Sequence, residues 1–102
     1  MDVCIDGARG TAVVTLNGDV DLACVGKLRD LLLVATQGAE HLVVVDASAA
    51  TFVDTTAIGV LIAAHRRMDD KKGSLRVVNA TVALRRVLRL LGADYLLDGA
   101  GA

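Results

Sequence analysis

Residues 42–65 read LVVVDASAATFVDTTAIGVLIAAH. Leu42–Val45 is continuously apolar and mostly β-branched, which is typical of a strand covered on both faces in a parallel sheet. A loop is expected at residues 47–50, and Asp54 can then cap a helix. The buried stripe of that helix would comprise Ile58, Leu61, Ile62 and Met68. The segment therefore predicts a strand, a loop and a helix, which is the unit from which parallel sheets are built.

Two strands and a helix are expected before this segment. Val3–Ile5 and Ala12–Leu16 predict a β-hairpin, and Asn17-Gly18 is a turn signal that should end the second strand. Asp21 is a natural N-cap. Apolar residues then recur at helical spacing until Gly38, the expected stop: Leu22, Val25, Leu28, Leu32 and Ala35.

A further strand and helix are expected after it. Leu75–Val78 predicts the strand, and residues 81–91 predict the helix, which Gly92 ends. Tyr95–Leu97 should add a short final strand or pack across the core, and residues 99–102 should fray. The order β-β-α-β-α-β-α predicts an α/β fold: one domain over residues 1–102, with a mixed sheet of four to five strands packed with three or more helices.

Composition limits the classes of function. The 102 residues are 54% hydrophobic with 11 basic and 12 acidic side chains, and this balance argues against a nucleic-acid interface. The longest apolar run, residues 57–64, is far shorter than the roughly 18 residues of a membrane span. Met1–Cys4 does not resemble a signal peptide. We therefore expect a soluble cytoplasmic protein without a membrane span.

Residues that could carry catalysis do not converge. His41 and His65 are isolated, and no nucleophile elbow or phosphate-binding glycine loop occurs. Asp19 and Asp21 are better explained as turn and cap residues than as an acid–base pair. Cys4 and Cys24 are expected to be small buried hydrophobes, and no spacing suits a metal. The sequence predicts a binding module with no catalytic residue, metal or cofactor.

Asp54-Thr55-Thr56 is the one candidate functional segment. It places two hydroxyls beside a carboxylate at the positive end of a helix dipole, where a phosphate would be tolerated. Asp and Thr are also preferred helix caps, so the residues alone favour an ordinary helix start over a modification site.

Three motifs, in order and over nearly the whole chain, resemble the STAS domain family of sulphate transporters and anti-sigma factor antagonists. Residues 16–21, LNGDVD, are similar to the family's Leu-x-Gly-Glu-Leu-Asp segment. Residues 43–48, VVVDAS, are similar to its central strand. Residues 52–59, FVDTTAIG, resemble the Phe-Met/Ile-Asp-Ser-Ser-Gly-Leu-Gly signature, with Thr-Thr for Ser-Ser and Ala57 for Gly.

The resemblance implies a role in partner switching. In the antagonist branch, the unmodified protein binds an anti-sigma factor and frees a sigma factor. The anti-sigma factor is also a serine/threonine kinase that phosphorylates the antagonist, and a metal-dependent phosphatase restores it. By position the phosphorylation site is Thr56, with Thr55 as the runner-up. The implied partner-binding residues are Asp21, Ala50, Asp54, Thr55, Thr56 and Ala57.

Two other functions are also compatible with the sequence. The chain could be a STAS scaffold, or a soluble subunit of a membrane transport complex, that is never phosphorylated. It could also be a small-molecule or nucleotide sensor, although no pocket motif supports this. No Lys or Arg lies within seven residues of Thr56, so a phosphate there should lack a neutralising cation. Arg85, Arg86 and Arg89 are expected to form a solvated face or to meet an acidic partner.

Overall fold

The computed structural model describes residues 1–98. Its elements are β1 (Asp2–Asp6), β2 (Thr11–Val20), α1 (Val25–Gly38), β3 (Leu42–Val53), α2 (Thr55–Asp70), β4 (Ser74–Val78) and α3 (Val82–Leu90), with 3-10 turns η1 (Leu22–Cys24) and η2 (Asp94–Leu96). The predicted order of strands and helices is confirmed. The fraying expected at residues 99–102 lies outside the described residues.

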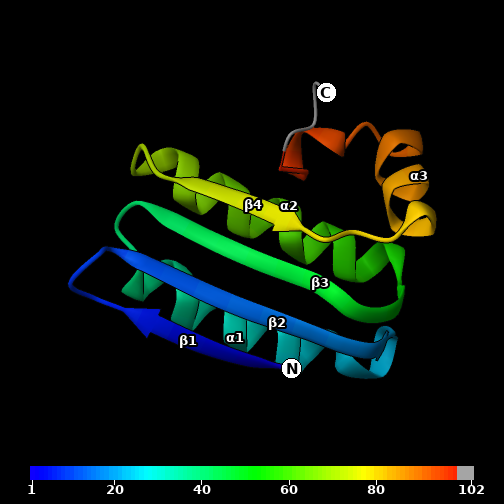
Figure 1. Ribbon diagram of the computed structural model, residues 1–102, viewed down its shortest axis with the longest axis horizontal. Coiled ribbons are helices and arrows are strands. Elements are labelled where there is room, and N and C mark those ends of the chain that lie inside the picture. The colour runs from blue at the N-terminus through cyan, green and yellow to red at the C-terminus, as the bar shows by residue number, and fades with distance from the viewer. Residues whose placement is uncertain (99–102) are drawn as a thin grey trace.

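The four strands form one mixed sheet in the order β1-β2-β3-β4 (Figure 1). β1 pairs with β2 in an antiparallel hairpin, whereas β2, β3 and β4 run parallel, as the two crossovers predicted. Helices α1 and α2 lie side by side behind the sheet, and α3 stands at the end where β3 finishes. The carboxyl ends of β2 and β3 therefore meet the starts of α1 and α2 at one end of the molecule.

β2 and β3 are both longer than predicted. The expected turn at Asn17-Gly18 is wrong, because β2 continues to Val20 in parallel pairing with β3. Gly18 takes a positive φ of 67° between two shifts of register, at each of which β3 has one more residue than β2, so the glycine lies in an irregular stretch of the strand pair rather than in a turn. The expected loop at residues 47–50 is also wrong. Pairing with β2 holds these small residues extended as part of β3.

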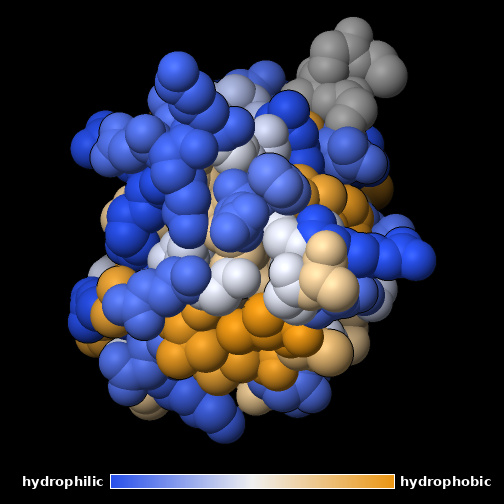
Figure 2. Space-filling view, turned by 90° about the vertical axis from the view of Figure 1, so that its left-hand side faces the viewer, coloured by the Kyte–Doolittle hydropathy of each residue, from blue (hydrophilic) through white to orange (hydrophobic). Residues whose placement is uncertain are grey.

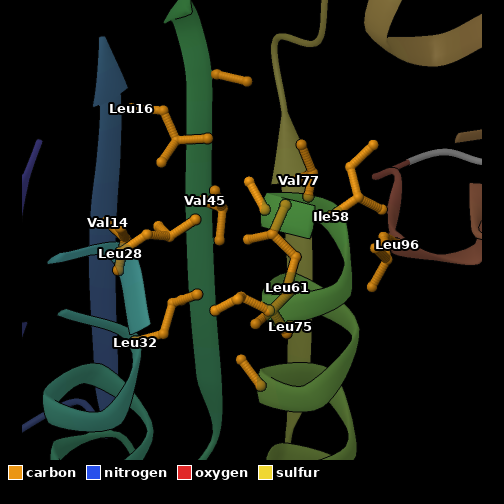
Figure 3. Close-up of a cluster of buried hydrophobic side chains, with 14 of the residues drawn as sticks. Val14, Leu16, Leu28, Leu32, Val45, Ile58, Leu61, Leu75, Val77 and Leu96 are labelled. Atoms are coloured by element: carbon orange, nitrogen blue, oxygen red, sulfur yellow. The ribbon is translucent and has the colours of Figure 1, made fainter. Parts of the chain in front are cut away.

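The core fills the space between the sheet and the two helices (Figure 3). Alternate strand residues point toward the helices, and each large side chain that they bury stabilises the fold by roughly 1.5–3 kcal/mol. The labelled core residues, all between 0% and 1% exposed, are Val14, Leu16, Leu28, Leu32, Val45, Ile58, Leu61, Leu75, Val77 and Leu96. All of them are aliphatic, as a chain with only two aromatic residues requires.

The opposite face of the sheet is more exposed. One cross-strand row on it joins Cys4, Val13, Val44 and Arg76. The expectation that Cys4 is buried is wrong, because β1 is an edge strand and Cys4 faces away from the helices; Cys24 is half-buried.

Toward the turn ends of the strands, Figure 2 shows an apolar patch low on the surface. β1 and the second half of α1 expose Ile5, Leu33 and Val34.

The ends of the helices depart modestly from expectation. Asp21 does serve as a cap, but for η1: its carboxylate accepts a hydrogen bond from the N–H of Ala23 at 3.1 Å. Leu22 consequently leaves the predicted apolar stripe and is 69% exposed. At the other terminus, Tyr95 and Leu96 form η2, and Leu97 makes a single bridge to Val77. No helix within residues 1–98 has the length and apolar character needed to cross a lipid bilayer.

Candidate functional site at the start of α2

The ends of β2 and β3 are tied together at the candidate site. The backbone N–H of Asp54 donates to the carbonyl of Val20 at 2.9 Å, which places Asp54 next to Asp21. The Thr51 hydroxyl donates to the carboxylate of Asp19 at 2.7 Å. These bonds hold two segments more than 30 residues apart in sequence as one acidic surface.

Helix α2 begins with the cap that the sequence predicts. The Asp54 carboxylate accepts a hydrogen bond from the backbone N–H of Thr56 at 2.7 Å, and its carbonyl accepts from Ile58 at 3.1 Å. Asp54 is half-buried, whereas Thr55 and Thr56 are exposed in the first turn. Both hydroxyls are therefore accessible to an enzyme, and the cap leaves them free.

The six predicted partner-binding residues gather around this turn but differ in exposure. Asp21, Thr55 and Thr56 are exposed. Ala50 and Ala57 are 6% and 0% exposed, so their side chains support the site from beneath. A role for any of them in partner binding stays a prediction.

Aspartates dominate this surface, but they do not form a metal centre. Asp19, Asp21 and Asp54 each use a carboxylate oxygen in a local hydrogen bond. Within residues 1–98, no group of three or more potential ligands could hold a metal ion.

Thr56 lines a groove that also receives two arginines, which its sequence neighbourhood does not reveal. A groove of about 290 Å³ runs between α1 and α2 and is lined by Arg29, Leu33, Thr56, Gly59, Val60, Ala63 and Arg67. Two cations, Arg29 from α1 and Arg67 from α2, therefore line the same groove as Thr56, although neither lies within seven residues of it in the sequence. The parallel crossovers in the sequence predict that α1 and α2 pack side by side. They do not predict how far one helix is shifted along the other, so they could not place Arg29 in this groove.

A small apolar cavity adjoins the site. It has a volume of about 60 Å³ and lies between the end of β3 and α3, lined by Ala50, Thr51, Phe52, Val53, Thr81, Ala83, Leu84 and Val87. Phe52 is 54% exposed at its mouth. Aromatic side chains are enriched in protein-binding sites relative to the rest of the surface.

Comparisons with known proteins agree with this architecture. The fold is similar to that of the anti-sigma factor antagonist SpoIIAA, from Bacillus, in its unphosphorylated form (TM-score 0.78, 23% identity, covering 88% of this chain and 79% of that one) and its phosphorylated form (0.71, 23%, 88% and 82%). An anti-sigma factor antagonist from Mycobacterium paratuberculosis has a TM-score of 0.75 at 24% identity, covering 93% and 80%.

The same fold also occurs in a transport context. A sulfate transporter family protein from Wolinella succinogenes has a TM-score of 0.73 at 14% identity, covering 94% of this chain and 76% of that one. A search of curated protein sequences gives no match. The family described as Mlab, STAS domain matches residues 4–98, which is nearly the whole chain. The chain therefore belongs to the STAS domain family.

Proposed function

We propose that this STAS domain is an anti-sigma factor antagonist that binds an anti-sigma factor with serine/threonine kinase activity and thereby releases a sigma factor. The observation that carries the proposal is the position of Thr56. Thr56 is exposed in the first turn of α2, donates its backbone N–H to the carboxylate of Asp54, and lines a groove between α1 and α2. The protein would act by binding, in the cytoplasm, without catalytic residues or cofactors.

Phosphorylation of Thr56 would switch the protein off by charge. A phosphate adds about 1.5–2 negative charges at neutral pH. The dipole of α2 stabilises an anion at this end by roughly 0.3–1 kcal/mol, so the fold should survive. A partner packed on the same surface would meet an added charge next to Asp54, and an unpaired charge in an interface costs several kcal/mol. A metal-dependent phosphatase would restore binding.

The neighbour SpoIIAA supports this scheme, because it is an anti-sigma factor antagonist whose structure exists in phosphorylated and unphosphorylated forms. Thr55 is the alternative site. It is also exposed, but the carboxylate of Asp54 accepts a hydrogen bond from the backbone N–H of Thr56 and not from that of Thr55.

Parallel affinity capture from lysate of the source cell tests the proposal, with the wild-type, Thr56→Glu and Thr56→Val chains as baits and mass spectrometry as readout. We expect an anti-sigma factor kinase on the wild-type and Thr56→Val baits and its loss on Thr56→Glu. The purified kinase with ATP should label the wild type and Thr55→Val but not Thr56→Val. Equal capture by all three baits, or labelling of Thr56→Val, would contradict the proposal.

A second candidate function is a subunit or scaffold in a membrane transport complex that is never phosphorylated. The similarity to a sulfate transporter family protein favours it. Two substitutions relative to the STAS signature also favour it: the Thr-Thr pair, and Ala57 where the signature has glycine. This alternative predicts capture of transporter components by all baits, so the same experiment separates the two.

A further inference from the structure

Helix α3 presents an unusual outer surface at the end of the molecule where β3 finishes (Figure 1). Leu84 and Leu88 face the core, at 6% and 0% exposure. The outer face carries Arg85, Arg86 and Arg89 between two apolar ends, Val82 and Leu90, which are 75% and 79% exposed. These five residues, which we call the α3 face, line a shallow hollow of about 410 Å³.

Among the described residues, the three arginines on the α3 face have no ion-pair partner. The ion pairs within residues 1–98 are Arg9–Asp6 and Glu40–His41, and neither involves α3. Arg85 uses only its Nε, which donates to the carbonyl of Ala80 at 3.4 Å. Arg85 and Arg89 are four residues apart and Arg86 and Arg89 three apart, so like charges are neighbours on the helix and destabilise it. The chain maintains this cluster although its net charge is -1.

We propose that the α3 face is a docking surface for an acidic segment of a protein partner. The complementary segment carries carboxylates at its centre and an apolar side chain at each end. Val82 and Leu90 are about 12 Å apart along the helix, so two to three turns of a partner helix would span the face. Guanidinium groups pair with carboxylates through two parallel hydrogen bonds, which gives this contact strength and orientation.

A protein fits this surface better than a membrane or a nucleic acid. A helix that binds a bilayer immerses a continuous apolar face, but the larger apolar face of α3 is buried in the core. Single-stranded nucleic acid binds on stacked aromatics, and α3 has none. The surface is distinct from Thr56, so this inference does not depend on the proposed switch.

Site-specific photo-crosslinking in the source cell tests the inference. The full chain carries p-benzoylphenylalanine in place of Leu90, and a control chain carries it in place of the exposed Val13 on the sheet. We expect position 90 to label a protein segment with an excess of Asp and Glu, and position 13 not to label that segment. Labelling of lipid or nucleic acid alone, of a segment without acidic excess, or of nothing would overturn the inference.

Charge reversal then tests whether the arginines bind the partner's acidic residues. The measurement uses the purified partner protein that the crosslinking identified. Arg86→Glu with Arg89→Glu should raise Kd at least about tenfold, and reversal of the partner's acids to Lys should restore part of the affinity. The matched control is Arg66→Glu with Arg76→Glu, two exposed arginines elsewhere that change the net charge equally. Equal effects of the two double variants, or no effect of the first, would overturn the inference. Circular dichroism confirms that each variant is folded.

Discussion

The carboxylate of Asp54 accepts the backbone N–H of Thr56 at 2.7 Å, so the cap of α2 and the candidate switch residue share one hydrogen bond. Asp54→Ala removes the acceptor at the start of α2, and we expect a loss of about 0.5–2 kcal/mol in the free energy of unfolding. Asp54→Asn retains an acceptor and should lose clearly less. Urea denaturation of the three proteins measures this, and equal losses for Ala and Asn would show that the charge, not the cap, matters.

Lys71 binds the C-terminal end of α1. Its Nζ donates to the carbonyls of Thr36 and Ala39 at 2.5 and 2.7 Å, where the last turn of α1 leaves carbonyls unpaired. Lys71→Met should therefore cost about 1–2 kcal/mol of unfolding free energy. Lys72→Met removes the same charge from a neighbour with no such contact in the described residues, and it should be nearly neutral. Similar melting curves for the two variants would contradict this assignment.

The fold was predictable where local pattern and tertiary pairing agree. The apolar run at Leu42–Val45 and the helical spacing from Ile58 to Met68 both led to the observed elements. Asn17-Gly18 misled because it is a hairpin signal only between antiparallel strands. Here the next partner of β2 is parallel, and Gly18 lies between two shifts of register within the strand. Residues 47–50 have weak strand propensity, so only their pairing with β2 reveals them as strand.

Asp46 on β3 gives the protein a specific pH dependence. The backbone N–H of Ser48, and then the side-chain amide of Asn79, donate to its carboxylate and lower the pKa of Asp46 below its ordinary value. A lowered folded-state pKa stabilises the fold fully above the ordinary pKa, and this contribution disappears as the pH falls through the folded-state pKa.

Asp46→Ala should therefore be more destabilising at pH 7 than at pH 3, as measured by urea denaturation at both values. Asn79→Ala provides the control, because loss of one donor should move the pKa of Asp46 upward in an NMR titration. A gap between wild type and Asp46→Ala that does not change with pH would contradict this account.

The candidate site was less predictable than the fold. Asp54, Thr55 and Thr56 are contiguous, and their helix start follows from their types alone. Arg29 was missed because it reaches the groove from α1, 27 positions earlier in the chain. Its position depends on how α1 and α2 align, which the contact between Arg67 and Thr36 at 3.2 Å reveals only in three dimensions.

Arg29 should moderate a negative charge at position 56. Thr56→Glu places a carboxylate where the α2 dipole favours it and where Asp54 opposes it, so we expect the unfolding free energy to change by less than about 1 kcal/mol. In an Arg29→Ala background the same substitution should be less favourable. Both side chains are exposed, so the coupling should be about 0.2–1 kcal/mol and should weaken in high salt.

A double-mutant cycle in urea, at low and high ionic strength, measures this coupling. Arg66→Ala serves as the matched control: Arg66 is exposed on α2, does not line the groove, and should show no coupling to position 56. Zero coupling for Arg29 would mean that a phosphate on Thr56 stays uncompensated, and partner release would then follow from the full added charge. Coupling that persists in high salt would indicate a direct hydrogen-bonded pair, in which Arg29 draws the phosphate into the groove between α1 and α2.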